Sequence, residues 1–232
     1  MTGSVLLFLW CLGTALEATF VVCSLARKSF LKYLFLNLYF LVSILTSVSR
    51  YLILRSYGVS SDEYMRCYYY TDALLTLTLF LAIISLFHHV FGELRFAKYV
   101  RTSAVLLLLG TAGFSYAVVA GTEEKLSSGT LAYELSQNLY FVGLVLTYIL
   151  WGAVLKLRET RTRLVQFVLA LGLYFSAHAA LYALMNMGER NQMLGYITPL
   201  LGCLLPLALT VTLIRYTEDA RLTPSNLVAV PR

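Results

Sequence analysis

Seven long apolar stretches, separated by short polar loops, run along the whole chain. A membrane-spanning helix needs about 20 consecutive, mostly apolar residues, and each stretch is about that long. Because lipid offers the backbone no hydrogen-bonding partner, such stretches are expected to be α-helices. The pattern predicts an all-α integral membrane bundle of seven transmembrane helices, over residues 3–25, 33–56, 67–93, 102–121, 133–155, 164–187 and 192–215.

The loops between these stretches alternate in charge, and this predicts the orientation of the bundle. Basic residues gather on one side, at Arg27, Lys28, Lys32, Arg95, Lys98, Arg101, Lys156, Arg158, Arg161, Arg163, Arg215, Arg221 and Arg232. Most acidic loop residues fall on the other side, at Asp62, Glu63, Glu123, Glu124 and Glu189. Since basic loops stay in the cytoplasm, we expect the N-terminus outside and the C-terminus in the cytoplasm.

The composition leaves no room for a soluble domain. Hydrophobic residues make up 59% of the 232 residues and charged residues only 13%, about half of the usual 25% in soluble domains. We expect one transmembrane domain over 1–216 and a short cytoplasmic tail over 217–232, which Pro224 and Pro231 should keep disordered. The net charge of +6 comes from loop clusters, so the expected partner is the lipid bilayer and not nucleic acid.

The length, loop size and composition resemble those of small seven-span proteins of bacterial inner membranes. The resemblance carries no motif and assigns no role to any residue. It implies a multi-pass protein of the bacterial cytoplasmic membrane if the source is bacterial.

The first apolar stretch allows a second interpretation, because Ala-Leu-Glu-Ala at 15–18 resembles a signal-peptide cleavage site. A signal peptide also has a basic segment before its apolar core. No Lys or Arg precedes this stretch, so we favour an uncleaved first helix. Cleavage would leave six spans.

Polar and ionisable residues recur in the outer half of four predicted helices. Such residues are costly within a membrane, and by default they suggest a functional site. One hypothesis is an outward-facing polar pocket that binds a small molecule, lined by Arg50, Asp72, Asn138, Tyr174, His178 and Tyr182. The simpler interpretation, which the sequence favours, is a hydrogen-bonded network that only holds the helices together, with Arg50 paired to Asp72.

Two further features of the spans have functional and structural interpretations. Glu17 lies in the cytoplasmic half of the first span and is a candidate proton-linked group. A protonated carboxyl bonded to a backbone carbonyl is the simpler alternative. Pro199, Gly202 and Pro206 make the seventh span a candidate hinge, with a static kink as the alternative.

A short internal match raises the question of a repeat. Asn-Leu-Tyr-Phe occurs at 37–40 in the second span and again at 138–141 in the fifth. These two spans run in opposite directions, as in an inverted repeat of three helices. The chain is rich in Leu, Tyr and Phe, so an accidental match is the simpler interpretation.

Cofactor chemistry and common enzyme motifs are not indicated. His88 and His89 are adjacent, so their side chains diverge by about 100° on a helix and cannot face one haem or metal. The four cysteines have no metal-ligand spacing, and the seventh span has no lysine for a retinal Schiff base. No phosphate-binding glycine loop, zinc-protease motif or nucleophile elbow occurs. We expect no cofactor and no enzymatic activity.

Two functions remain as hypotheses. The first is a receptor-like or accessory membrane module that acts through a separate signalling or membrane protein, because the tail is too short for an output domain. The second is a small secondary transporter with its substrate path near Arg50, Asp72 and His178.

Overall fold

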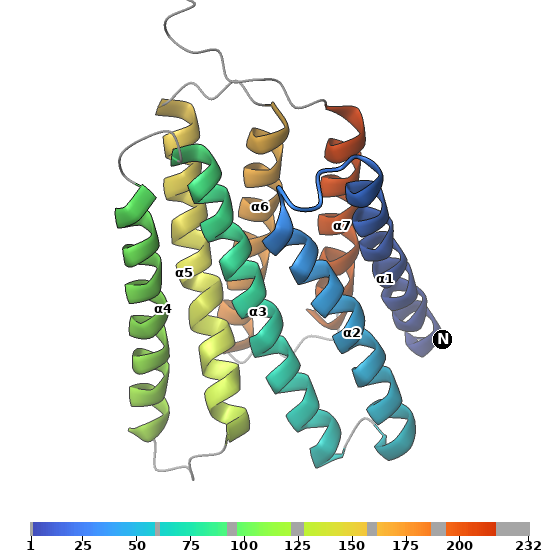
Figure 1. Cartoon of the computed structure of the whole chain (residues 1–232). Coiled ribbons are helices and arrows are strands. Elements are labelled where there is room, and N and C mark those ends of the chain that lie inside the picture. Colours follow the sequence, from blue (N-terminus) through green and yellow to red (C-terminus); the bar gives the residue numbers. More distant parts are fainter. Residues whose placement is uncertain are drawn as a thin grey trace, which may run out of the picture.

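The computed structural model describes residues 2–58, 61–91, 97–121, 128–156, 162–186 and 194–216, and within these ranges it is all-helical. Figure 1 shows the helices side by side in one bundle. They are α1 (Thr2–Ala26), α2 (Leu34–Tyr57), α3 (Asp62–Phe91), α4 (Ala97–Ala120), α5 (Ser128–Lys156), α6 (Thr162–Asn186) and α7 (Leu194–Arg215). The predicted all-α, seven-helix architecture is confirmed. The predicted tail, 217–232, lies outside the described residues.

Six of the helices are long and apolar enough to cross a membrane, and α4 contributes a shorter apolar segment, Val105–Ala120. Large apolar side chains stay exposed on the outside of the bundle, for example Leu45 at 67% and Leu173 at 73%. Such a surface suits acyl chains and not water. The chain is therefore a multi-pass membrane protein.

Three helices begin five residues earlier than hydropathy indicates, and one of them is the fourth, which starts at Ala97 and not at residue 102. The third starts at Asp62 and not at residue 67, because Ser61 caps it: Ser61 Oγ accepts a hydrogen bond from the Tyr64 amide at 3.1 Å. Asp62 and Glu63 lie in the first turn, where the positive end of the helix dipole stabilises their negative charges. The fifth starts at Ser128, ahead of the predicted 133. Because polar first turns carry no hydrophobic signal, hydropathy underestimates the lengths of the third and the fifth helix.

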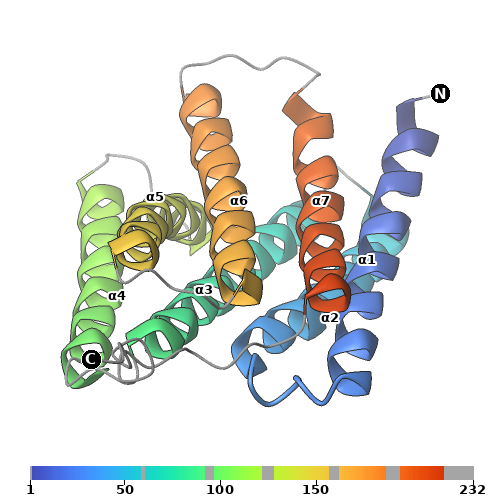
Figure 2. The ribbon, with the colours of Figure 1, turned by 90° about the horizontal axis from the view of Figure 1, so that it is seen from above.

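Six helices form a closed ring, and α4 lies outside it. Around the ring α1 packs on α2, α2 on α3, α3 on α5, α5 on α6, α6 on α7, and α7 back on α1. Figure 2 shows this order from above, with α4 beside α5 at the edge of the bundle. An inverted repeat would match the close α3–α5 packing with an equally close α6–α2 packing. Among the described residues the α2 and α6 backbones do not pack closely, and long side chains such as Tyr39 and Tyr174 bridge them. The helix packing thus gives the Asn-Leu-Tyr-Phe repeat no support.

Aromatic side chains fill the ring. Phe20, Phe40 and Phe167 are fully buried, and the ring of Phe20 lies 4.8 Å from that of Phe40 and 6.4 Å from that of Phe167. Their helices, α1, α2 and α6, come from both halves of the chain. This apolar centre fixes the neighbouring polar residues in place.

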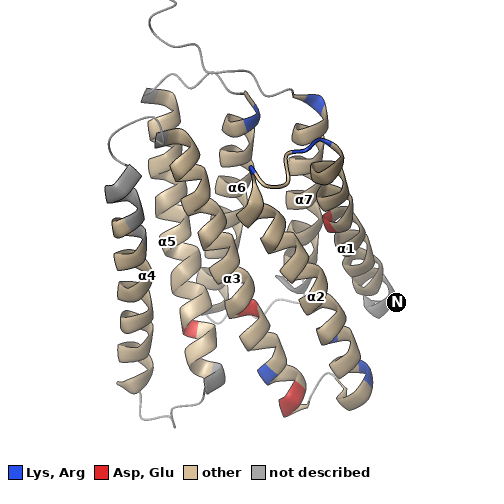
Figure 3. Ribbon diagram, viewed as in Figure 1, with Lys and Arg blue, Asp and Glu red and all other residues tan. Residues whose placement is uncertain are grey.

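Charged residues gather toward the two ends of the bundle. Figure 3 shows Lys and Arg (blue) at the end with the α1–α2 turn and the end of α7, and also on the opposite ends of α2 and α3, where most of the acidic residues (red) lie. We name the first end the cytoplasmic end and the opposite one the outer end, after the orientation that the loop charges predict.

Candidate functional site

Arg50 of α2 reaches across to α3 and binds neutral partners there. Its Nε donates to Thr71 Oγ1 at 2.7 Å, and its second terminal nitrogen donates to the Tyr68 carbonyl at 3.2 Å. The guanidinium carbon lies 4.4 Å from the centre of the Tyr68 ring, a cation–π contact. Arg50 thus fastens α2 to the outer part of α3. The Arg50–Asp72 ion pair of the network hypothesis is absent, since neither residue makes an ion pair with a described partner.

Asp72, about one helical turn further into α3 than Tyr68, is bound from the opposite side of the bundle. Tyr182 of α6 donates its hydroxyl proton to Asp72 Oδ2 at 2.9 Å. The side chains of Asp72 and Tyr182 are only partly buried. The bond joins two helices that make few other contacts with each other. It is a cross-bundle tie in the outer half of the ring.

Tyrosine rings surround this tie. Tyr69 lies 6.0 Å from Tyr133, Tyr133 lies 5.5 Å from Tyr182, and Tyr182 lies 5.5 Å from Tyr140, each between ring centres. Tyr68 is 6.0 Å from Tyr69. Tyr68, Tyr133, Tyr140 and Tyr182 are close enough to Asp72 to interact with its charge. We call Asp72 with Tyr68, Tyr69, Tyr133 and Tyr182 the outer tyrosine cluster.

A buried polar group continues from this cluster toward the middle of the bundle. Tyr140 stacks on His178 with ring centres 4.8 Å apart, and His178 lies 4.1 Å from Tyr174. Tyr174 shares a hydrogen bond of 3.2 Å with Tyr39 of α2. His178 Nδ1 lies 3.1 Å from the Tyr174 carbonyl oxygen, which requires the ring proton on Nδ1. Residues from α2, α5 and α6 thus meet at one buried point, 8% exposed or less.

Glu17 lies on the far side of Tyr39, between α1 and α2. Its Oε1 accepts a hydrogen bond of 2.7 Å from Ser43 Oγ. Its Oε2 is buried without a described partner, and the residue is 7% exposed. The expected bond to a backbone carbonyl is absent, and a serine takes its place. Tyr39 is close enough to interact electrostatically with both Glu17 and Asp72.

The structure therefore brings together Asp72, Tyr174, His178 and Tyr182 of the predicted site, and it separates Asn138 from them. Asn138 Nδ2 donates to Ser115 Oγ of α4 at 3.0 Å, on the side of α5 that faces the outlying helix. Sequence position alone gave Asn138 the right depth but not the right face. Arg50 lies beside the cluster but is occupied by α3 groups.

The candidate hinge lies in an unbroken helix. Pro199 and Pro206 are both inside α7, which runs continuously from Leu194 to Arg215. Gly202 lies against α1: a Cβ on Gly13 would meet the Gly202 carbonyl carbon at 3.7 Å and Cys203 Sγ at 3.5 Å. A Cβ on Gly202 itself would meet nothing within 4 Å, so this contact does not require a glycine there. Motion at the prolines stays a prediction.

Arg163 is a structural residue that sequence analysis placed among loop charges. It is 5% exposed at the start of α6, and it donates to the carbonyl oxygens of Leu213 and Tyr216 at the end of α7. A cation at a helix C-terminus satisfies unpaired carbonyls and the helix dipole. The cytoplasmic ends of α6 and α7 are thereby joined. Its place in a basic loop hides this role.

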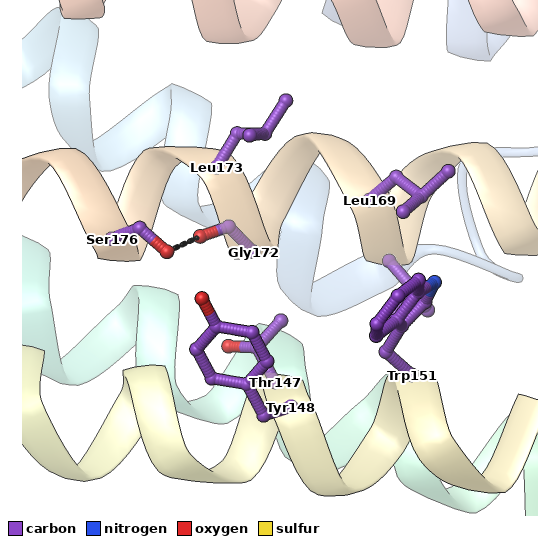
Figure 4. A pocket seen from close by; sticks show the side chains of 8 residues that line it. Thr147, Tyr148, Trp151, Leu169, Gly172, Leu173 and Ser176 are labelled. Atoms are coloured by element: carbon purple, nitrogen blue, oxygen red, sulfur yellow. Dashed lines mark hydrogen bonds between the residues drawn. The ribbon is translucent and has the colours of Figure 1, made fainter.

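A groove of about 140 Å³ lies away from the polar residues, between α5 and α6. Figure 4 shows Thr147, Tyr148 and Trp151 of α5 facing Leu169, Gly172, Leu173 and Ser176 of α6, with the Ser176–Gly172 hydrogen bond inside one helix. Its lining has no charged residue, and Tyr148 and Leu173 are largely exposed on the lipid side. We therefore assign the groove to lipid contact and the ligand chemistry to the outer tyrosine cluster.

The histidine pair shows no sign of a shared site. The rings of His88 and His89 are 6.5 Å apart and inclined by 76°, and His89 Nδ1 lies 2.8 Å from the Ser85 carbonyl oxygen. Among the described residues no group of three His, Cys, Asp or Glu could hold a metal ion.

Comparison with known proteins adds no relative. No protein-family model, curated protein or solved structure matches the chain. The class of protein that the fold defines is a multi-pass helical membrane protein, and anything finer is argued from the site alone.

Proposed function

We propose that this protein is a receptor-like membrane module that binds a small molecule from the outer side, at Asp72 and the surrounding tyrosines, and acts through a separate membrane or signalling partner. The proposed site keeps only some of the residues of the predicted pocket. Asp72, Tyr182, His178 and Tyr174 remain together, Arg50 holds the cluster in place, and Asn138 belongs to the α4 contact.

One observation carries this proposal: Asp72 has a phenol partner and no cationic one, although Arg50 binds the neighbouring turn of the same helix. A charged side chain inside a membrane costs about 2.5–3.5 kcal/mol or more. A close ion pair would return about 4 kcal/mol at 4 Å and an effective dielectric constant of 20. The fold forgoes that gain by binding Arg50 to Thr71 and Tyr68 instead. A carboxylate kept apart from an adjacent arginine suits a site that receives its counter-charge from a ligand.

The cross-bundle tie offers a route for signalling. A ligand that binds Asp72 competes with Tyr182 and so changes how α3 is held to α6. The inner end of α6 is joined to α7 through Arg163 and the Tyr216 carbonyl. A change at the outer end therefore has a mechanical path to the cytoplasmic end, where a partner would bind.

The test is ligand-dependent thermal stability of the purified protein in lipid nanodiscs, against a library of small charged and neutral compounds. A ligand at 100 times its dissociation constant adds about 2.7 kcal/mol of stability. We expect at least one compound to stabilise the wild type and Glu134→Gln, a matched outer carboxyl change, but not Asp72→Asn. If Asp72→Asn does not fold, Tyr182→Phe serves as the test in the other direction: it removes the tie and keeps the carboxylate, so the compound should still stabilise it, and a folded Tyr182→Phe protein that the compound no longer stabilises would contradict the proposal. A library without any Asp72-dependent stabiliser would contradict the proposal and favour the structural network.

A transporter is the second candidate, and Glu17 favours it. Its unpartnered buried oxygen and the polar residues between it and Asp72, namely Ser43, Tyr39, Tyr174, His178, Tyr140 and Tyr182, suit a proton-coupled path. Counterflow of the stabilising compound in reconstituted vesicles separates the two functions. Uptake that Glu17→Gln abolishes would assign transport, and binding without uptake would assign a receptor.

A further inference from the structure

We propose that the ligand of the outer tyrosine cluster is a small organic ammonium ion. This inference rests on the proposed function and names its ligand class. The starting point is the charge of Asp72, a carboxylate whose described hydrogen-bond partner is a neutral phenol, while the nearby Arg50 is bound to α3 groups. An anionic ligand at Asp72 would face repulsion from the carboxylate, whereas a cation is attracted by it.

The surroundings of Asp72 decide between a metal ion and an organic cation. Calcium takes six to eight oxygen ligands, and magnesium needs an octahedral set, usually one or two carboxylates with waters and phosphate oxygens. Asp72 has no further metal-ligating side chains around it, since the described residues contain no group of three His, Cys, Asp or Glu that could hold a metal ion. An ammonium group needs far less: one carboxylate and the faces of neighbouring aromatic rings.

The tyrosine rings supply those faces from three helices. Tyr68 and Tyr69 come from α3, Tyr133 from α5 and Tyr182 from α6, with consecutive ring centres 5.5–6.0 Å apart. All four side chains keep part of their surface exposed, as does Asp72. The cluster already holds one cation on an aromatic face, because the Arg50 guanidinium lies 4.4 Å from the Tyr68 ring centre. Arg50 is held on the Tyr68 ring by its two hydrogen bonds to α3.

The Tyr182 hydroxyl is the group that the ligand displaces. It donates to one oxygen of Asp72, so an ammonium ion that approaches the carboxylate weakens this bond. Removing the hydroxyl while keeping the ring should therefore preserve or strengthen ligand binding. A purely structural Asp72–Tyr182 tie predicts only a loss of stability from the same change.

The experiment is titration of the full-length protein in nanodiscs with choline, followed by calorimetry and thermal shift. The control ligand is 3,3-dimethylbutan-1-ol, which has the same shape and no charge. We expect wild type and Glu134→Gln to bind choline, and affinity to fall on the order of tenfold or more in Asp72→Asn. Tyr182→Phe should bind choline at least as tightly as wild type. The neutral compound should bind markedly more weakly than choline.

Three results would overturn the inference: no choline binding to wild type, equal binding to wild type and Asp72→Asn, or equal binding of the neutral compound. Tyr182→Phe keeps the test valid if Asp72→Asn does not fold, since loss of choline binding in a folded Tyr182→Phe also contradicts displacement. If choline fails while another library compound stabilises the protein through Asp72, the ligand class is wrong and the proposed function stands.

Discussion

Asn37 and Asn138, the first residues of the two Asn-Leu-Tyr-Phe segments, contribute very differently to the structure. Asn37 is fully buried, and its Nδ2 donates to Ser24 Oγ, the Phe30 carbonyl and the Tyr33 carbonyl at 3.0–3.1 Å. It therefore holds the α1–α2 turn, in which Lys28 takes a left-handed backbone conformation. Asn138 is only partly buried and donates to Ser115 alone. Identical side chains thus differ in the number of buried groups that depend on them.

The first prediction at this scale compares Asn37→Ala with Asn138→Ala. The Tyr33 carbonyl also accepts the Asn37 backbone amide at 3.0 Å, so Asn37→Ala removes the donor only from Ser24 Oγ and the Phe30 carbonyl. At about 1–3 kcal/mol for each unpaired buried acceptor, the substitution should lower stability by about 2–6 kcal/mol. Asn138→Ala loses one hydrogen bond and should cost about 0.6–1.7 kcal/mol. Thermal unfolding of both purified variants in the same nanodiscs measures the difference. Equal losses would mean that the α1–α2 turn is not held as described.

Depth along each helix was predictable from the sequence, and side-chain partners were not. Asp72, His178 and Tyr182 were expected in the outer half, and the structure brings them together. Arg50 was expected to pair with Asp72, and it binds Thr71 and the Tyr68 carbonyl instead. Charge alone suggests the ion pair, whereas the length and direction of the Arg50 side chain decide the outcome. Arg163 shows the same limit, because a buried role at the end of α7 leaves no trace in a basic loop.

At the scale of elements, α5 and α6 pack very closely at Gly143 of α5, which has a nearer side-chain neighbour than any other described glycine. A Cβ on Gly143 would lie 2.1–2.8 Å from three carbons of the Phe175 ring, and Phe175 is fully buried. The ring therefore rests on the bare backbone of α5. Small residues allow such close packing of helices in membranes.

Gly143→Ala should accordingly destabilise the protein by about 1–3 kcal/mol, because the overpacked ring must move within a filled core. Gly110→Ala on α4 is the matched control, since a Cβ there meets nothing within 4 Å. The measurement is the unfolding midpoint of each variant in nanodiscs. A Gly143→Ala protein as stable as Gly110→Ala would show that α5 and α6 are further apart than described.

Helix existence followed from hydropathy, and helix ends did not. Seven apolar stretches predicted seven helices, but the Ser61 cap and the acidic first turn of α3 extend that helix beyond its apolar part. Pro199 and Pro206 lie inside α7, which runs continuously from Leu194 to Arg215. Hydropathy measures burial in lipid, while caps and backbone bonds decide where a helix begins and ends.

At the scale of the whole molecule, the ring of six helices with α4 outside it is the feature that no local pattern predicts. Ring closure depends on which apolar faces meet, as in the α1–α7 contact between the two ends of the chain. Apolar stretches in a membrane protein are hydrophobic on all sides, so they give little information about neighbours. The closed ring is what gathers side chains of α3, α5 and α6 around Asp72.

An outward-facing Asp72 site requires that the Asp72 end of α3 faces the outside and that the α1–α2 turn faces the cytoplasm. Cys67 lies one to two turns from Asp72 and is partly exposed, and Leu31 in the turn is 81% exposed. One variant keeps Cys67 and replaces Cys11, Cys23 and Cys203 with Ser. A second also carries Cys67→Ser and Leu31→Cys.

Labelling of intact cells with a membrane-impermeant thiol reagent tests this directly. If the Asp72 site faces outward, Cys67 should react before the cell membrane is permeabilised, and the Leu31→Cys thiol should react only afterwards. Reaction of the Leu31→Cys thiol from outside, with Cys67 protected until the membrane is opened, would contradict an outward-facing Asp72 site.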